Sequence, residues 1–174
     1  MIEGVSLHDG VLPADVVAHL WQWMQMLSFT RTERGIIHLS RALQNDNTGS
    51  EQARYLIALL KEHGVDRHID FDDVSVVRYD GGADYVDWHS DGGALLEPGC
   101  AMGLISFGAT RAIEFRRKDG ESNVSRVMLH ENDLLVSREG FQDQHEHRIP
   151  PCDSQEMRMS VVLYTHNKQK RKRN

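Results

Sequence analysis

Apolar residues recur at helical spacing in the first third of the chain. The first stripe follows Pro13, which suits the start of a helix, and it comprises Val16, Val17, Leu20, Trp21, Met24 and Leu27. A second stripe, at 53, 56, 59 and 60, follows a loop cluster over 46–50 and ends near Gly64, with Ser50 able to cap the helix. This pattern predicts a helical preface over 1–73, with a short strand at Ile36-Ile37.

From Val74 onward, short β-branched and aromatic runs alternate with turn residues. The runs predict eight strands, over 74–79, 84–89, 101–107, 111–117, 125–130, 133–137, 145–149 and 157–165. Closely spaced strands between Gly, Pro and Asn-Asp turns are typical of a β-sandwich or a double-sheet jelly roll. The expected fold class is therefore mainly β with N-terminal helices (α+β).

Length and composition fit one soluble domain. The chain has 174 residues, of which 40% are hydrophobic and 26% charged. Its two cysteines make no disulfide framework, no signal-peptide h-region is evident, and no apolar run approaches a membrane span. We expect a cytoplasmic monomer without a membrane partner, with one domain over 1–167 and a disordered tail over 168–174.

The net charge of −6 hides an asymmetry. Five of the twenty Lys and Arg residues lie in 168–173, so residues 1–167 carry fifteen basic against twenty-six acidic side chains, a net charge of −11. An acidic body argues against a nucleic-acid partner, whereas a basic tail can follow phosphates. A basic tail more often serves only solubility or is disordered, so it adds little to the argument for a nucleic-acid partner.

Histidines and an aspartate suggest a metal site. In an extended segment over 84–91, His89 and Asp91 project to the same side. A third ligand from His145 or His147 would give two imidazoles and one carboxylate, a set that suits a non-haem Fe(II) oxygenase. The non-functional alternative is that His89 and Asp91 lie in a solvated loop or make a structural hydrogen bond, and that the later histidines form a polar strand face.

Arg158 and Ser160 share one face of the last predicted strand. A guanidinium fork beside a hydroxyl suits a carboxylate in apolar surroundings, and the hydroxyl of Tyr79 is a further candidate partner. Taken singly, Arg158 is by default an edge-strand arginine in a surface ion pair, and Tyr79 alone fits a core tyrosine better than a cosubstrate ligand.

The order and spacing of these residues resemble the 2-oxoglutarate/Fe(II) dioxygenases, and more narrowly the AlkB-like family. Tyr79 is followed by His-x-Asp ten residues later, by His147 fifty-eight residues after His89, and by Arg-x-Ser eleven residues after that. The segment 78–91, ending in Trp-His-Ser-Asp, is similar to the family's N-x-Y-x-x-G…W-H-S-D. The segment 132–136 is similar to its G-D-L-L-V strand, and 147–150 to its H-x-V-P strand.

The resemblance implies a double-stranded β-helix (jelly-roll) core over 74–167, with Fe(II) and 2-oxoglutarate as cofactors and O₂ as co-substrate. It implies that His89, Asp91 and His147 ligate iron, and that Arg158 with Ser160 holds the distal carboxylate of 2-oxoglutarate, assisted by Tyr79. His147 is preferred to His145 as the third ligand because of its H-x-[VI]-P context.

Three positions depart from the AlkB-like pattern. Val77 replaces the usual Asn, Tyr164 stands where a second Arg is usual, and Gly93 replaces the acidic residue that many members use to contact the base. Ser160 in place of Asn occurs in other 2-oxoglutarate oxygenases. The metal and cosubstrate pattern therefore survives better than the substrate-reading pattern.

Several functions follow from these patterns. The first is oxidative demethylation of N-alkylated nucleic-acid bases, with methylated single-stranded nucleic acid as partner. The alternative is a hydroxylase of a protein side chain or small metabolite on the same fold. More remote are a non-catalytic β-sandwich binding module and a zinc hydrolase with Glu146 as general base.

Overall fold

The computed structural model describes residues 2–31, 35–36, 38–40, 47–62, 69, 71, 73–91, 100–120 and 123–165, with backbone only at 35–36, 38–40 and 47–50. The expectations for Ile37, Gly64, Gly93 and the tail over 168–174 lie outside the described residues. No helix within the described ranges is long and apolar enough to cross a membrane.

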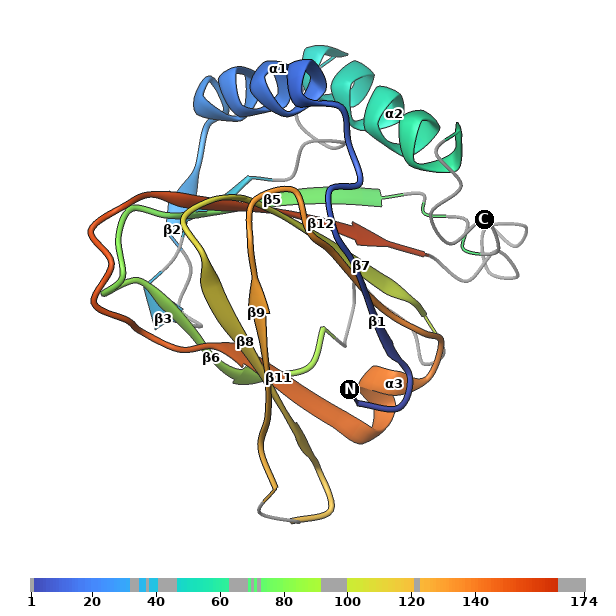
Figure 1. The fold of residues 1–174 in the computed structure, drawn as a ribbon, viewed down its shortest axis with the longest axis vertical. Helices are drawn as coiled ribbons and strands as arrows, with labels where there is room; N and C mark the ends of the chain where they lie inside the picture. Colours follow the sequence, from blue (N-terminus) through green and yellow to red (C-terminus); the bar gives the residue numbers. More distant parts are fainter. Residues whose placement is uncertain are drawn as a thin grey trace.

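Two antiparallel sheets form the body of the molecule (Figure 1). The seven-stranded sheet runs, in spatial order, β1 (Val5–His8), β10 (Leu134–Ser137), β7 (Met102–Gly108), β12 (Arg158–Tyr164), β5 (Asp73–Tyr79), β4 (His38–Ser40) and β2 (Thr30–Arg31). The five-stranded sheet runs β3 (Gly35–Ile36), β6 (Tyr85–His89), β11 (His145–Ile149), β8 (Arg111–Arg117) and β9 (Ser125–Leu129). Mostly antiparallel strands in two sheets confirm the expected jelly-roll class.

The central strands of the seven-stranded sheet are buried on both faces. Helices α1 (Ala14–Gln25) and α2 (Asn47–Glu62) cover its outer face, where Leu20 and Leu56 pack with Ile105 and Val161. Side chains of opposite parity, such as Val162, pack inward against residues of the five-stranded sheet. Burial on both faces explains why β7 and β12 are almost continuously apolar in sequence.

All eight strands predicted from Val74 onward are present, each within one residue of the expected bounds. In the preface both expected helices are present, and β3 includes Ile36, where a short strand was expected, but the described residues there also form β1, β2 and β4, which the pattern did not predict. These strands are two to four residues long, and β1 is held by pairing with β10, more than 120 residues away. Such short segments are too brief to show a period, so long-range pairing decides their structure.

Two local expectations also differ from the structure. Helix α2 begins at Asn47, so Ser50 lies inside the helix and does not cap it, and part of the expected loop over 46–50 is helical. A single helical turn, α3 (Phe141–Gln144), begins after Gly140, whose φ of +79° favours glycine. It leads directly into β11.

The turn between β5 and β6 is tied to the segment that precedes β12. The Gly82 N–H donates to the Ser154 carbonyl at 2.6 Å, and the Cys152 N–H donates to the Gly82 carbonyl at 2.8 Å. A Cβ at Gly82 would lie 2.1 Å from the Cys152 carbonyl oxygen. This approach requires glycine and fixes the chain next to Tyr79.

Candidate metal and carboxylate site

Strand pairing places His89 directly opposite His147 across β6 and β11. Their ring centroids lie 4.3 Å apart. Asp91 lies two residues beyond His89, after β6 has ended, and its two carboxylate oxygens lie 3.5 Å from Nε2 of His89 and 3.5 Å from Nε2 of His147. One ligand atom from each residue falls within 4.8 Å of the other two, which is close enough to hold one metal ion.

The protonation states also suit a metal. Burial lowers the pKa of His147 to about 4, against the opposing effect of Asp91, so its ring is neutral near pH 7. For Asp91, burial raises the pKa, but His147 and His89 outweigh it and hold the pKa below its ordinary value. A neutral imidazole and an ionised carboxylate are the forms that bind metals.

The backbone of β6 fixes the tautomer of His89. Its Nδ1 lies 2.7 Å from the Asp87 carbonyl, and because a carbonyl only accepts, Nδ1 carries the proton. Nε2 therefore presents its lone pair toward Asp91 and His147. Such outer contacts orient ligating histidines in metal sites.

His145, the rival third ligand, lies elsewhere. Its ring stacks on Phe141 with centroids 4.1 Å apart and an interplanar angle of 3°, and its Nδ1 lies 3.1 Å from the Phe141 carbonyl. The candidate metal group among the described residues contains His147 and not His145. These side-chain contacts of His145 are with Phe141 on α3.

Arg158 faces Tyr79 across β12 and β5 and is fully buried. Its Nε donates to Ser106 Oγ at 3.1 Å. Nη1, Nη2 and the nearby Ser160 Oγ are buried and find no partner in hydrogen-bond geometry among the described residues. A buried guanidinium with two unused nitrogens needs an anionic acceptor, so a cosubstrate carboxylate fits this cluster.

The electrostatics around Tyr79 agree with that fit. Burial lowers the pKa of Arg158 to about 10, so the guanidinium stays charged at neutral pH. Burial raises the pKa of Tyr79, although Arg158 and Arg111 act in the opposite direction, so the phenol keeps its proton and can donate it. The Arg158 guanidinium and the Tyr79 hydroxyl can therefore both donate hydrogen bonds to a bound anion.

Two residues near the site escaped the sequence analysis. Arg111 is buried, its guanidinium carbon lies 5.4 Å from the Tyr79 ring centroid, and it donates to the carbonyls of Gly81, Asp84 and Pro150. Gln142 on α3 accepts the Asp91 N–H at 2.7 Å. Neither partner is close in sequence, so no local pattern signalled them.

A family model described as the 2OG-Fe(II) oxygenase superfamily matches residues 31–173. The chain belongs to this superfamily. The cofactors of this oxygenase are therefore Fe(II) and 2-oxoglutarate, in agreement with the His-Asp-His group and with the unpaired nitrogens of Arg158. The expected class of enzyme, an Fe(II)/2-oxoglutarate-dependent dioxygenase, is confirmed.

One curated relative supports the AlkB-like relation of this oxygenase. The α-ketoglutarate-dependent dioxygenase alkB homolog 3 of Rattus norvegicus is 36% identical over 91 residues, which is 47% of this chain and 31% of that protein. The chain spans about a third of the length of the curated relative it matches.

Solved structures share the fold. A 2OG-Fe(II) oxygenase from Burkholderia pseudomallei matches with a TM-score of 0.72 at 13% identity, covering 95% of this chain and 88% of that one. A prolyl-4-hydroxylase from Pseudomonas putida gives 0.64 at 15% identity, over 94% and 93% of the two chains. A Trichoplax adhaerens prolyl hydroxylase, in complex with a hypoxia-inducible-factor peptide, gives 0.65 at 15% identity, over 98% and 87%.

Proposed function

We propose that this oxygenase oxidatively removes N-alkyl groups from nucleic-acid bases. The observation that carries the proposal is the 36% identity to the rat alkB homolog 3 over 91 residues. The prolyl hydroxylases share the fold at 15% identity, a level that indicates architecture and not substrate.

In this proposal His89, Asp91 and His147 hold the Fe(II). Two imidazoles and one carboxylate are the donor set typical of non-haem Fe(II) oxygenases, and a metal held by these three residues would keep further ligand positions for the cosubstrate and O₂. Bound Fe(II), with 2-oxoglutarate and O₂, supplies the oxidation of a substrate C–H bond and releases succinate and CO₂. When that bond belongs to an N-methyl group, the hydroxylated product loses formaldehyde.

Arg158, Ser160 and Tyr79 hold the cosubstrate. Nη1 and Nη2 of Arg158 donate to its distal carboxylate, Ser160 Oγ donates beside them, and the protonated Tyr79 phenol supports the same group. Because Arg158 is fully buried, water does not compete for this contact.

The alternative is hydroxylation of a protein side chain or small metabolite. It is favoured by three sequence positions, Val77, Tyr164 and Gly93, at which the chain departs from the AlkB-like pattern. The two proposals share the metal and cosubstrate residues and differ only in the substrate.

The deciding experiment is an assay of Fe(II)-loaded protein with 2-oxoglutarate and O₂ on single-stranded DNA and RNA carrying N-methylated bases. We expect formaldehyde release together with loss of one CH₂ from the oligonucleotide mass. The matched unmethylated oligonucleotides should give neither, and the His89→Ala and Arg158→Ala variants should abolish both.

The result that would contradict the proposal is succinate formation stimulated by a protein or metabolite, with no formaldehyde from any methylated oligonucleotide. That result would favour the alternative and leave the proposed metal and cosubstrate residues intact.

A further inference from the structure

Strand β6 contains a β-bulge immediately before His89. His89 pairs with His147 and Val86 pairs with Ile149, so two residues, Asp87 and Trp88, lie opposite the single residue Arg148. Val86 and His89 are three residues apart, so in a regular strand they would face opposite sides of the sheet, because side chains alternate. The bulge lets both face the interior, and bulges beside active sites commonly aim a side chain in this way.

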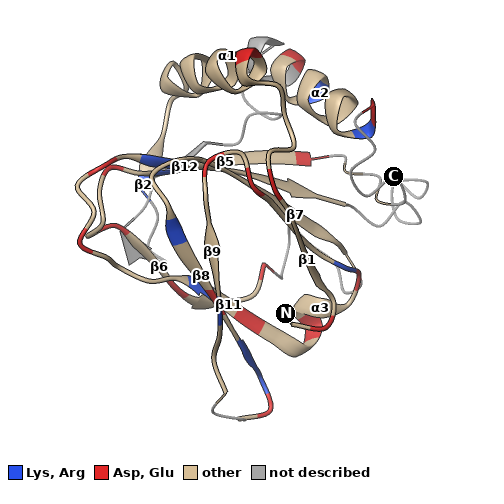
Figure 2. Cartoon of the chain, viewed as in Figure 1, with Lys and Arg blue, Asp and Glu red and all other residues tan. Residues whose placement is uncertain are grey.

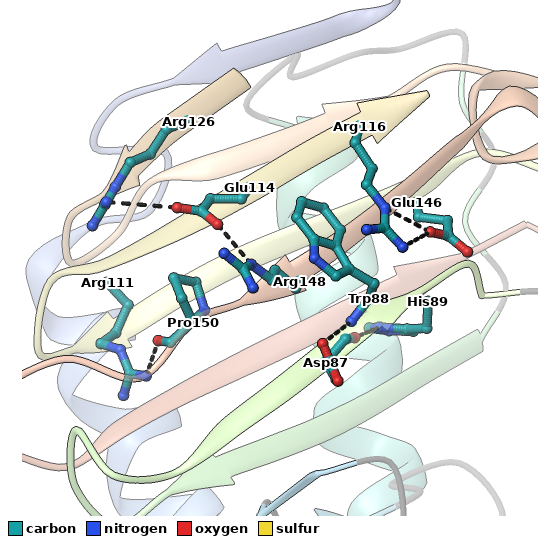
Figure 3. A network of polar contacts seen from close by, with 10 residues as sticks. All are labelled: Asp87, Trp88, His89, Arg111, Glu114, Arg116, Arg126, Glu146, Arg148 and Pro150. Atoms are coloured by element: carbon teal, nitrogen blue, oxygen red, sulfur yellow. Dashed lines mark hydrogen bonds and ion pairs between the residues drawn. The ribbon is translucent and has the colours of Figure 1, made fainter. Parts of the chain in front are cut away.

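Trp88 is held on the outside of this bulge by two arginines. The guanidinium carbon of Arg116 on β8 lies 4.4 Å from a Trp88 ring centroid, and that of Arg148 on β11 lies 4.6 Å away. In Figure 3 the indole lies between the two guanidinium groups. Cation–π contacts of this length are attractive, so both neighbouring strands hold the indole.

Ion pairs fix these arginines in turn. Charges of both signs lie next to one another on β8, β9 and β11 (Figure 2). Arg116 pairs with Glu146 at 2.6 Å and Arg148 with Glu114 at 2.7 Å, each with the residue directly opposite on the neighbouring strand. Opposite charges at facing positions stabilise strand register.

The bulge connects this network to the candidate metal ligand. The Trp88 N–H donates to Asp87 Oδ1 at 2.8 Å, and the Asp87 carbonyl accepts the Nδ1 proton of His89 at 2.7 Å. The Asp87 carbonyl, which fixes the tautomer of His89, therefore belongs to the same bulge as Trp88.

We propose that Trp88, gripped by Arg116 and Arg148, is a positioning residue that holds the Asp87–Trp88 bulge so that His89 presents Nε2 to the metal. The inference rests on the proposed role of His89 as an iron ligand. Trp88 does not touch the metal, and it acts through the Asp87 carbonyl.

The test uses the full chain with Co(II) in place of Fe(II) under anaerobic conditions. Trp88→Leu removes the aromatic ring, Trp88→Phe keeps a smaller one, and Arg148→Met removes one cation. The matched control is Arg126→Met, which deletes an arginine that pairs with Glu114 on the same face, away from Trp88 in Figure 3.

We expect Trp88→Leu to weaken Co(II) binding at least about tenfold, the scale seen when an outer contact of a metal ligand is lost. The hydrogen-bonded Nδ1–H signal of His89, seen by NMR of ¹⁵N-histidine-labelled metal-free protein, should disappear in this variant. Trp88→Phe should keep most of the Co(II) affinity and of the His89 signal, and Arg148→Met should give values between those of Trp88→Leu and the wild-type protein. Arg126→Met should match the wild-type protein in both measurements.

A purely structural role predicts a different result. Trp88→Leu would then lower the melting temperature while the Co(II) Kd stayed within about twofold and the His89 signal persisted, which would overturn the proposal. If Trp88→Leu does not fold, Arg148→Met decides the matter, and a Co(II) affinity and a His89 signal that equal those of the wild-type protein would overturn the proposal.

The failure of the proposed function is distinguishable. If the unchanged protein and its His89→Ala variant bind Co(II) equally, His89 is not a ligand, and both the metal assignment and this inference are wrong. If only His89→Ala loses affinity while the Trp88 variants keep it, the metal assignment stands and this inference alone is wrong.

Discussion

Arg158 carries a buried positive charge, and among the described residues its guanidinium donates to Ser106 Oγ and lies next to the Tyr79 hydroxyl, with no carboxylate beside it. Burying a charge without a counter-ion is costly, and the cost falls when an anion binds. Two effects should therefore favour the binding free energy of the cosubstrate: the new hydrogen bonds to its carboxylate and the neutralisation of the buried Arg158 charge.

The affinity for 2-oxoglutarate should therefore depend on pH at the alkaline end. Binding requires the protonated guanidinium, and burial lowers the pKa of Arg158 to about 10, so the protonated fraction falls as the pH rises through that value. We expect a constant Kd between about pH 7 and 9 and a rise of about tenfold per pH unit above 10. Equilibrium dialysis with Mn(II)-loaded protein measures it, with bound Mn(II) followed in the same samples. A decline that begins below pH 8 would assign the dependence to another group.

Gln142 deserves a direct test because it holds Asp91 from a helix turn that no motif predicted. In Gln142→Leu the Asp91 N–H loses its acceptor at 2.7 Å, and the carboxylate loses a neighbour that lowers its pKa. We expect metal affinity to fall about tenfold. Co(II) titration measures this loss, with Gln155→Leu on the exposed segment before β12 as control. Equal affinities in the two variants would contradict it.

The sequence indicated the residues whose order along the chain carries meaning. His89, Asp91, His147 and Arg158 follow one another at spacings that set them apart from chance pairs, and the fold brings the first three together; their roles stay predictions. The sequence analysis did not predict the contacts of Gln142 and Arg111, or the cation–π contacts of Trp88. Each of these contacts joins residues that are distant in sequence.

Among the elements, predictability followed burial and length. The strands from β5 onward are four to seven residues long, are separated by turn residues, and are mostly buried. Their apolar runs between turns therefore predicted them correctly. The four strands of the preface are two to four residues long, and pairing with other strands decides their structure. The bulge in β6 is likewise visible only in the register with β11.

The turn between β5 and β6 should tolerate a methyl group at one glycine and not at the next. Gly82→Ala places a Cβ 2.1 Å from the Cys152 carbonyl oxygen, whereas at Gly81 the nearest atom is 3.9 Å away. We expect Gly82→Ala to lower the free energy of unfolding by about 3 kcal/mol and Gly81→Ala to change it by less than about 1 kcal/mol. Urea denaturation measures both. Similar losses in the two variants would show that the turn as a whole, and not the approach at Gly82, limits substitution.

For the whole molecule, the candidate metal ligands join strands that lie far apart in sequence. A metal that binds only the folded chain stabilises it by about 2.7 kcal/mol at one hundred times its Kd. We expect Co(II) to raise the melting temperature by about 5–10 °C. Calorimetry measures the shift, which a chelator should reverse and His147→Ala should abolish. A shift that persists in His147→Ala would place the metal elsewhere.

The position of β12 has a consequence for the stage of folding at which the proposed site is completed. β12 is the last described strand, yet it lies between β5 and β7, and it carries Arg158. Until β12 inserts, the seven-stranded sheet remains split and the proposed cosubstrate contact is missing.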